Sequence, residues 1–303
     1  MRTAYLGTSE FAATVLRRLS GSPHRPALVV TPPDSRRGRG RKLAPPPTAE
    51  AARELGLGLH QTANVNSADS LEAVRAAEPE AIAVCAFGQL IREPLLSEFL
   101  MLNVHPSLVP RWRGAAPIER ALMAGDRETG VTIMRVTAGL DSGPVALAER
   151  IPITDEDDYA SLSAKLAELG GDLLERALDA LEAGELEFTE QDDSAASYAK
   201  KISPEERHLE PGLAASELER IVRALTPHIG AYLELEDGDR LGVRAARAVL
   251  GGPAQGEIEA TGEGLLLGSA DGALRLEMVQ PPGKKPMSAA DFLRGHAPPS
   301  KAL

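Results

Sequence analysis

The chain has 303 residues, of which 43% are hydrophobic and 25% are charged, as in ordinary soluble globular proteins. This length is sufficient for two domains with real cores. The formal net charge of −11 argues against a general affinity of the whole surface for nucleic acid, although it leaves room for a local basic patch. No apolar run approaches the roughly 20 residues that span a bilayer, and residues 1–7 resemble a strand and a turn, not a signal peptide. A cytoplasmic protein is therefore expected.

In the first hundred residues, short apolar segments alternate with amphipathic ones. The expected strands are residues 3–7, 27–31, 81–86 and 100–105, and the expected helices are residues 10–19, 49–55 and 67–77. Ser9 is placed to cap the first of these helices. The alternation is typical of a parallel, doubly wound sheet, in which ligands bind beyond the carboxyl ends of the strands. His105 falls at such an end.

The rest of the chain has two parts with different patterns of expected elements, which a polar stretch separates. Further expected elements are a helix at 115–123, strands at 131–136 and 145–153, and a long helix at 158–181. Residues 184–207 are polar, and we expect a linker at 190–206. After a helix at 213–224, short strands separated by glycines are expected at 231–236, 241–249, 256–260, 264–268 and 273–279. The sequence thus predicts an α/β domain with a doubly wound, mostly parallel sheet at 1–189, and a small OB-like β-barrel at 207–303.

The end of the strand expected at residues 100–105 carries an amide and an imidazole on one face. Asn103 and His105 are two residues apart, and side chains two apart on an extended chain point the same way. Asp141 comes later, in the glycine-bounded turn Gly139–Gly143. Direct acyl transfer needs an amide to stabilise an oxyanion, an imidazole to carry a proton and a carboxylate to orient the imidazole. These three residues are therefore the candidate catalytic trio.

Each of these residues also has a simpler structural explanation. An Asn-X-His pair near a strand end often only satisfies buried hydrogen bonds, and an aspartate in such a turn often only shapes it. The proline-rich loop that follows His105 favours function, because a stiff loop suits a preformed ligand wall. Trp112, the only tryptophan, either belongs to that wall or plugs the loop onto the core. Spacing alone does not say whether Asp141 approaches His105.

A basic loop follows the second expected strand, between Pro32-Pro33 and Pro45-Pro47. Its five cations are Arg36, Arg37, Arg39, Arg41 and Lys42. The interleaved glycines disfavour helix and strand, so we expect a loop that is mobile when unbound. Five cations in an otherwise acidic protein attract a polyanion, which predicts a contact with nucleic acid. The alternative is a solvated charged surface.

Several common cofactor motifs are absent from the sequence. The first strand-to-helix turn, Gly7–Ala12, lacks the glycines of the dinucleotide fingerprint, and is either an anion-binding helix start or simply a tight turn. There is no Walker loop, no cysteine pair and no His-X-X-X-His spacing, so no metal site is expected. Cys85, the only cysteine, lies in an apolar run and is expected to be a buried structural thiol.

Taken together, these segments make the chain resemble the methionyl-tRNA formyltransferase family nearly from end to end. The matching segments are Gly7–Ala12, Asp34–Leu43, Asn103–Ile118, Gly130–Arg135, Gly139–Gly143, Leu218–Pro227 and Gln280–Met287. The Asn-X-His pair and the later Asp are shared by formyltransferases that use 10-formyltetrahydrofolate, so they imply the chemistry. The Arg-Trp-Arg-Gly-Ala-Ala-Pro run, the basic insert and the expected β-domain point to the enzymes that act on tRNA.

The resemblance implies roles for individual residues. The catalytic trio is Asn103, His105 and Asp141. The residues implied in contacts with the folate co-substrate are Phe87, Gly88, Gln89, Leu90, Ser107, Leu108, Val109 and Pro110. Those implied in contacts with tRNA are Arg36, Arg37, Arg39, Arg41 and Lys42, with Arg39 at the position that similar enzymes use on the acceptor stem.

The chain departs from the family pattern at a few positions. Val109 stands where leucine is commoner, and Phe87 replaces a frequent tyrosine. His208-Leu209-Glu210 occupies the place of an Ile-Asp-Trp triplet that many members have. This last departure concerns the packing or contacts at the start of the C-terminal domain, and leaves the chemistry unaffected.

The reaction implied is direct transfer of the formyl group of 10-formyltetrahydrofolate to the α-amino group of methionine on initiator tRNA, for the initiation of translation. It needs no covalent enzyme intermediate and no metal. The expected partners are that tRNA and the folate, and the sequence indicates neither a membrane nor an obligatory protein partner. Two alternatives stay open. A formyltransferase for a nucleotide-linked amino sugar or another small amine shares the trio without needing the basic insert, and a non-catalytic RNA-binding protein needs no trio.

Overall fold

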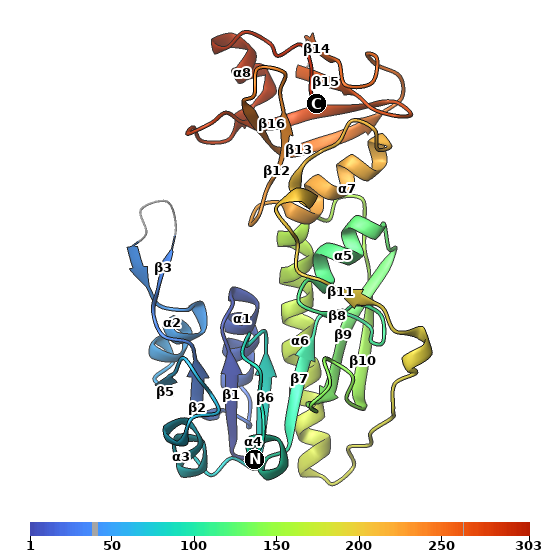
Figure 1. Cartoon of the computed structure of the whole chain (residues 1–303). Coiled ribbons are helices and arrows are strands. Elements are labelled where there is room, and N and C mark those ends of the chain that lie inside the picture. The colour runs from blue at the N-terminus through green and yellow to red at the C-terminus, as the bar shows by residue number, and fades with distance from the viewer. Residues whose placement is uncertain (38–41, 263) are drawn as a thin grey trace. The chain divides into compact units, whose positions relative to one another are not determined.

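The computed structural model describes residues 1–37, 42–262 and 264–303 (Figure 1). The chain divides into two compact units, each of which is described here by itself. The first unit comprises Met1–Gly114, Glu128–Pro152 and Ser163–Tyr198. The second comprises Ala115–Arg127, Ile153–Leu162 and Ala199–Leu303. In the described part of the chain, no helix is both long and apolar enough to cross a membrane.

The first unit is built on a seven-stranded sheet in the order β10-β9-β7-β6-β1-β2-β5. The strands are β1 (Thr3–Gly7), β2 (Pro26–Thr31), β5 (Gly58–Gln61), β6 (Ala81–Cys85), β7 (Met101–His105), β9 (Glu128–Arg135) and β10 (Val145–Pro152). From β5 to β7 every neighbouring pair is parallel, whereas β9 runs antiparallel to both β7 and β10. The prediction of a mostly parallel sheet is confirmed. The short strand β5, at the edge of the sheet, is not predicted by the sequence pattern.

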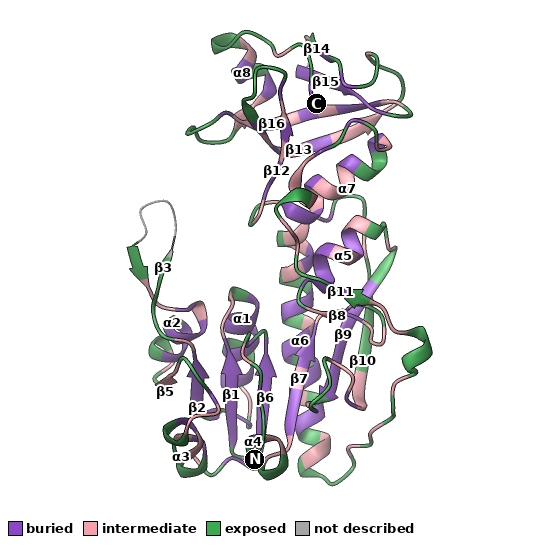
Figure 2. Ribbon diagram, viewed as in Figure 1, coloured by how far each residue is buried: buried purple, intermediate pink, exposed green. Residues whose placement is uncertain are grey.

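Helices cover both faces of this sheet. On one face, Leu6 and Ile82 belong to an apolar cluster with residues of α3 (Ala68–Ala76) and α4 (Leu95–Glu98). On the other face lie α1 (Glu10–Ser20) and, from its residue 163 onward, α6 (Tyr159–Glu182), since a Cβ at Gly170 would meet Val104 of β7. The helix α2 (Pro47–Glu54) packs beside α1. Consequently the central strands are buried (purple in Figure 2), and the expected doubly wound arrangement is present.

The helix after β1 begins as the sequence predicts. The Ser9 hydroxyl accepts a hydrogen bond from the backbone N–H of Ala12 at 3.3 Å, which satisfies one free donor of the first turn. Cys85 at the end of β6 is fully buried, and burial raises the pKa of its thiol to about 12. The prediction of a buried structural thiol is confirmed.

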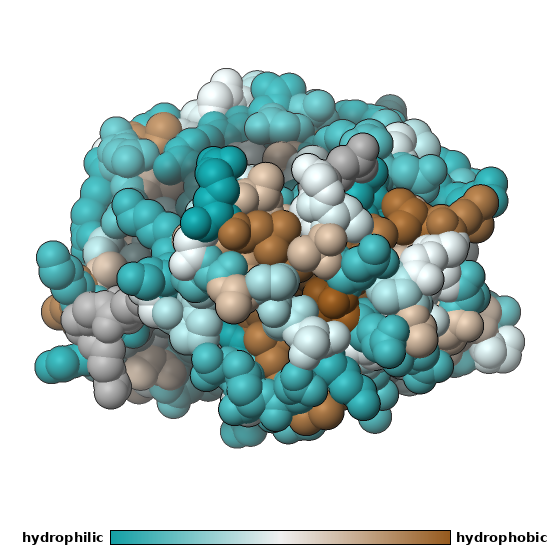
Figure 3. All heavy atoms as spheres, turned by 90° about the horizontal axis from the view of Figure 1, so that it is seen from above, coloured by the Kyte–Doolittle hydropathy of each residue, from teal (hydrophilic) through white to brown (hydrophobic). Residues whose placement is uncertain are grey.

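The second unit contains the sheet β12-β13-β16-β15-β14, with β17 added beside β16. Its strands are β12 (Ala231–Glu234), β13 (Arg240–Val249), β14 (Ile258–Thr261), β15 (Gly264–Gly268), β16 (Ala273–Gln280) and β17 (Met287–Ser288). Residues near the C-terminus close this sheet, because Ala302 bridges to Leu235 after β12 and Lys301 bridges to Glu257 before β14. The result is the small antiparallel barrel that the glycine-separated strands predict. Most of the surface drawn in Figure 3 is hydrophilic.

Helices complete the second unit. They are α5 (Pro117–Ala124), α7 (Ala215–Leu225) and α8 (Ala289–Gly295), of which α8 was not expected. The helix α5 packs against α7, where Arg220 donates a hydrogen bond to the carbonyl of Met123 at 3.2 Å. The helix α7 buries Leu218, Val222 and Leu225 in the barrel core. Short elements also occur in both units. The first unit contains β8 (Arg113–Gly114) and the 3-10 helix η1 (Asp193–Ala195), the second contains the 3-10 helix η2 (Glu205–Arg207), and β11 (Tyr198–Ala199) lies where the two units join in the sequence.

The basic loop differs from its expectation. We expected its glycines to prevent regular structure, but β3 (Ser35–Arg37) and β4 (Lys42–Ala44) form an antiparallel ladder. The ladder is possible because the glycines lie between the two paired segments and not within them. Gly38 and Gly40, like Arg39 and Arg41, lie outside the described residues.

Candidate active site

The structure brings the three predicted catalytic residues together at the carboxyl end of β7. Asn103 Nδ2 donates a hydrogen bond to Asp141 Oδ1 at 3.3 Å, and His105 Nδ1 lies 3.7 Å from Asp141 Oδ2. The backbone N–H of Gly114 also donates to Asp141 Oδ2, at 2.8 Å. His105 is buried, whereas Asn103 and Asp141 are partly exposed, so these two polar groups beside the imidazole are accessible to solvent.

The other ring nitrogen of His105 faces a backbone carbonyl. Its Nε2 lies 2.9 Å from the carbonyl oxygen of Trp112, in the loop after β7. A carbonyl only accepts hydrogen bonds, so this contact requires a proton on Nε2. In neutral His105, Nδ1 is therefore the unprotonated nitrogen, and it is the nitrogen nearest the Asp141 carboxylate.

Unusual backbone angles gather around this site. Among the described residues, four that are not glycine have positive φ, and three of these are Ala86, Trp112 and Asp141, at 43°, 61° and 46°. Such conformations cost of order 1–3 kcal/mol and persist where the surrounding structure holds them. Ala86 directly follows β6 and Trp112 lies in the loop after β7, whereas Asp141 reaches this region because its side chain contacts Asn103 and the backbone of Gly114.

The segment after β6, predicted to contact folate, contains both buried and open residues. The side chain of Phe87 is buried in the apolar core, and Gln89 binds the backbone of a neighbouring loop at Thr62 and Val65. Gly88 is exposed, and the side chain of Leu90 is 63% exposed. Any ligand at this segment therefore meets the Leu90 side chain and the backbone of Gly88.

The turn after His105, also predicted to contact folate, is fixed by the protein itself. Ser107 is buried, with its hydroxyl donating to the carbonyl of Arg111 at 2.7 Å. Thr132 of β9 accepts from the N–H of Val109 at 3.3 Å and donates to the carbonyl of Ser107 at 2.7 Å. Leu108, Val109 and Pro110 are partly exposed. This rigidity agrees with a preformed ligand wall.

The predicted tRNA-binding cations lie on the β3–β4 hairpin, of which part is described. Arg36 pairs in register with Leu43, and Arg37 pairs with Lys42. Arg36 and Lys42 are exposed. Leu43, which follows Lys42 in the chain and pairs with Arg36, is 70% exposed. The predicted contacts of Arg39 and Arg41 lie outside the described residues.

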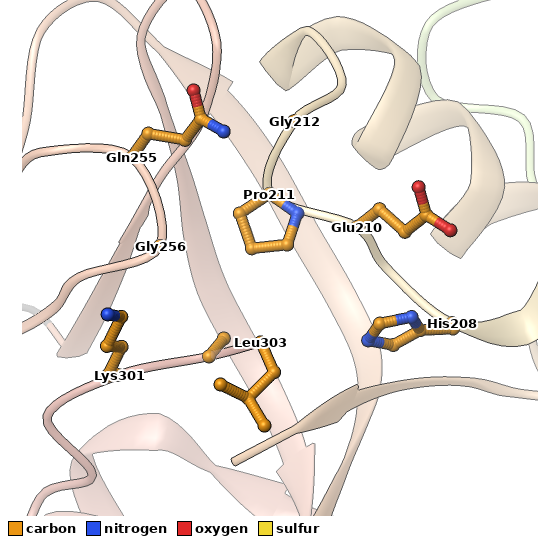
Figure 4. Close-up of a pocket in the computed structure, with 9 residues that line it drawn as sticks. His208, Glu210, Pro211, Gly212, Gln255, Gly256, Lys301 and Leu303 are labelled. Carbon is orange, nitrogen blue, oxygen red and sulfur yellow. The ribbon is translucent and has the colours of Figure 1, made fainter. Parts of the chain in front are cut away.

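A separate shallow pocket lies wholly within the second unit. It is lined by the residues shown in Figure 4, which are His208, Glu210, Pro211, Gly212, Gln255, Gly256, Lys301, Ala302 and Leu303. It includes His208 and Glu210 of the triplet that departs from the family pattern. The imidazole of His208 stacks on Tyr232, and its buried Nε2 has no hydrogen-bond partner in the part of the chain that the structure describes. The unusual triplet therefore packs against the closed barrel. Among the described residues, no group of side chains has the composition of a metal site.

Two polar residues that the sequence analysis did not select also lie at the site. Arg113 is only 3% exposed, and it binds the side chain of Gln191, which in turn donates to the loop that carries Asp141. Arg113 lies within the Arg-Trp-Arg-Gly-Ala-Ala-Pro run, and this run could have indicated that Arg113 belongs to the site. Gln191 lies in the polar stretch interpreted as a linker, where nothing in the local pattern distinguishes it.

Solved structures share this fold at low sequence identity. A variant of HypX from Aquifex aeolicus matches with a TM-score of 0.70 and 20% identity, over 98% of this chain and 48% of that one. An N-formyltransferase from Helicobacter canadensis, solved in complex with folinic acid and dTDP-3-aminofucose, matches with a TM-score of 0.68 and 15% identity. That match covers 90% of this chain and 97% of the other. At such identities the likeness shows the fold alone.

Sequence comparisons show the family. The family model described as formyl transferase matches residues 1–178, and the formyl transferase C-terminal domain matches residues 201–297. A methionyl-tRNA formyltransferase from Methylococcus capsulatus is 43% identical over 100% of this chain and 99% of its own length. One from Halorhodospira halophila is 42% identical over 97% and 96%. Because this similarity extends through both domains, the chain belongs to the methionyl-tRNA formyltransferase family.

Proposed function

We propose that this enzyme transfers the formyl group of 10-formyltetrahydrofolate to the α-amino group of methionine on initiator methionyl-tRNA, in the cytoplasm, where translation begins. The observation that carries the proposal is the meeting of Asn103, His105 and Asp141 at the end of β7, in a chain whose relatives over its full length bear that name. We assign the transfer chemistry to residues 1–189 and tRNA docking to residues 207–303, joined by the linker at 190–206.

The three side chains have distinct parts in the transfer. The methionyl amine attacks the formyl carbon, and negative charge develops on the formyl oxygen. The bond from that carbon to N10 of the folate then breaks, so that tetrahydrofolate leaves with a proton on N10 while the attacking amine loses one. One N–H of Asn103 binds Asp141, which leaves its second N–H for that oxyanion. His105 exchanges its proton at Nδ1, because Nε2 donates to Trp112. Asp141 lies beside this nitrogen, where its carboxylate orients the imidazole.

The loops beside the trio suit a co-substrate that is partly flat and apolar. Among the described residues, few large apolar side chains are strongly exposed, and two of them are Leu90 and Leu140, each 63% exposed. Leu140 precedes Asp141, and Leu90 is the last residue of the segment after β6 that is predicted to contact folate. Exposed apolar side chains around polar groups are typical of ligand-binding sites, and a pterin ring covers such side chains while its edge forms hydrogen bonds.

The tRNA substrate is supported by a different part of the first unit. The β3–β4 hairpin presents Arg36 and Lys42 to solvent in a chain whose net charge is −11. Cations concentrated on one projecting hairpin attract phosphate without making the entire surface basic. An enzyme for an amino sugar has no need of this feature.

The experiment that tests the proposal is a transfer assay with 10-formyltetrahydrofolate and three acceptors. These are charged initiator tRNA, elongator tRNA carrying the same methionine, and a nucleotide-linked amino sugar. We expect rapid formylation of the initiator, slower formylation of the elongator and none of the sugar. Formylation of the sugar alone would assign the enzyme to another substrate class, and no transfer to any acceptor would refute catalysis.

A further inference from the structure

A strap, defined here as residues 189–197, lies across the loop between β9 and β10. Thr189 exchanges two backbone hydrogen bonds with Val145 at the start of β10, with N···O distances of 2.8 and 2.9 Å. Val145 follows closely on the loop that carries Asp141. The first residue of the strap therefore fixes it beside the candidate active site.

The far end of the strap holds the loop after β7. The N–H of Ser197 donates to the carbonyl of Pro110 at 3.1 Å, and the carbonyl of Ser197 accepts from the N–H of Arg113 at 2.9 Å. The Ser197 hydroxyl accepts from the N–H of Trp112 at 3.0 Å. Trp112 is the residue whose carbonyl faces His105. The strap thus ties together the two loops that position His105 and Asp141, all within the first unit.

Gln191 forms the central contact of the strap. Its Nε2 donates to the carbonyls of Asp141 at 3.0 Å and Gly143 at 2.7 Å. Its Oε1 accepts from Nε and Nη2 of Arg113 at 3.0 and 2.8 Å. The buried Arg113 guanidinium also binds Asp193 Oδ1 at 2.7 Å. Both ends of the amide are therefore used, so its orientation is determined by its partners.

This arrangement restrains Asp141 from two directions. Gln191 holds its backbone carbonyl, while Gly114 and Asn103 hold its carboxylate. The backbone of Asp141 has a φ of 46°, a conformation that persists only where the surroundings over-determine it. Without Gln191, the loop loses its side-chain hydrogen bonds to the carbonyls of Asp141 and Gly143, so the backbone that carries the carboxylate is less restrained.

We propose that Gln191, itself held by Arg113, is a positioning residue that keeps the Asp141 carboxylate against His105 during formyl transfer. The inference rests on the proposed function, since it assigns a task within that reaction. In this assignment Gln191 acts on the reaction through Asp141, because its hydrogen bonds run to Arg113 and to the loop that carries Asp141.

Two substitutions in the full-length chain test this role. Gln191→Met preserves the approximate volume and removes every hydrogen bond. Gln191→Glu keeps an acceptor for Arg113 but replaces the donor to the Asp141 and Gly143 carbonyls with a carboxylate. A displacement of about 1 Å at a reacting group costs on the order of 10²-fold in rate, so we expect kcat to fall by roughly 10- to 100-fold in both variants. We expect KM for folate and for tRNA to change by less than about threefold, because the hydrogen bonds that these substitutions remove join protein groups to one another.

The pH dependence of kcat separates positioning from a merely structural role. In Gln191→Met the Asp141 carboxylate is less firmly held beside His105, so the dependence of kcat on pH is expected to differ from that of the parent. Glu190→Gln is the matched control, because this neighbour on the same strap is exposed and outside the network. It should retain the parental kcat and pH profile.

Arg113→Lys tests the residue that holds Gln191. Lysine keeps the positive charge beside Asp193 but cannot make both hydrogen bonds to Gln191 Oε1, so we expect a decrease in kcat that is smaller than in the Gln191 variants.

The outcomes divide clearly. A parental kcat and pH profile in both Gln191 variants would overturn the inference, as would a lower melting temperature with unchanged kcat per folded molecule. If Gln191→Met does not fold, Gln191→Glu decides by the same measurements. Failure of the parent enzyme to formylate methionyl-tRNA would refute the proposed function instead, and is seen before any variant is compared.

Discussion

Nδ1 of His105 lies 3.7 Å from Oδ2 of Asp141, while Nε2 of the same ring lies 2.9 Å from the carbonyl of Trp112. The two contacts are not equivalent. The carbonyl requires a proton on Nε2, whereas the carboxylate faces the nitrogen that gains and loses one. The distance to Asp141 is within range for an ion pair but longer than a hydrogen bond, and catalytic contacts of this kind often tighten when substrate binds. This relationship between His105 and Asp141 underlies the first two predictions.

His105→Ala should reduce transfer by roughly 10²–10⁴-fold or more, since it removes the proton carrier and a charge next to the oxyanion. Asn103→Ala should reduce it in the same direction through the loss of an amide donor. Single-turnover formylation of charged initiator tRNA measures the rate, and a folate-binding titration is the control, which we expect to be nearly unchanged. Turnover close to that of the parent in His105→Ala would remove this residue from the mechanism.

Asp141→Asn should lower the rate with little change in folate affinity. The amide retains the shape of the carboxylate but lacks its charge, and one end of it presents a donor where Asn103 or Gly114 now donates. The measurement is kcat against pH for both proteins. A profile identical to that of the parent would show that Asp141 and His105 are not coupled. If Asp141 only shapes its turn, the substitution should alter thermal stability and leave kcat intact.

Neutralising the basic hairpin should weaken tRNA binding without affecting folate. The positions to change are Arg36, Arg37, Arg39, Arg41 and Lys42. For every cation that binds a phosphate, its removal should flatten the log–log dependence of the tRNA binding constant on salt concentration by about one unit. A salt slope equal to that of the parent would leave the hairpin as a solvated surface.

Single changes in the same hairpin should separate affinity from discrimination. Lys42→Gln is expected to weaken binding of initiator and elongator tRNA alike, because an exposed lysine at the hairpin contacts phosphate. Arg39→Gln is expected to narrow the preference for the initiator if this residue reaches base edges. The measurement is the ratio of the two binding constants at one fixed salt concentration. An equal decrease in the binding constants of both tRNAs in Arg39→Gln would show that this arginine, too, contacts the phosphate backbone of tRNA.

Cys85 should not react with iodoacetamide in the native protein at pH 8. With a thiol pKa of about 12, roughly one molecule in ten thousand carries the thiolate at that pH, and the side chain is fully buried. Stoichiometric alkylation should appear only in denaturant, where the thiol regains an ordinary pKa. Mass spectrometry of the intact protein follows the modification. Rapid alkylation of the folded enzyme would show that β6 opens readily.

The same raised pKa has a consequence for stability. In the unfolded chain Cys85 ionises near pH 8.5, whereas in the folded protein burial keeps it protonated to about pH 12. The folded state therefore binds more protons in this interval, and its stability should decrease as the pH rises from about 9 towards 12. Burial also raises the pKa of Tyr5, which acts in the same direction. Urea unfolding at pH 8 and pH 10 measures the difference.

The sequence by itself determined the buried central strands, the antiparallel strands of the second unit and the position of Asn103 and His105 at the end of β7. Periodicity places β1, β6 and β7 within a residue or so of their observed bounds, because buried strands require uninterrupted apolar residues. The Asn-X-His spacing puts both side chains at the end of β7, since alternate residues of a strand share a face. Glycine-separated strands likewise predict the barrel of the second unit.

Only the tertiary structure decided which distant groups meet. Asp141 is separated from Asn103 by 38 positions, and no local pattern shows that its loop folds back to accept the amide of Asn103. Gln191 lies in a polar stretch whose composition is that of a linker, and its role appears only when Arg113 and the Asp141 loop surround it. Local sequence encodes propensity and the alternation of buried and exposed side chains. Hydrogen bonds between loops depend instead on how the β9–β10 loop and the strap fold back onto the residues after β7, which local sequence does not encode.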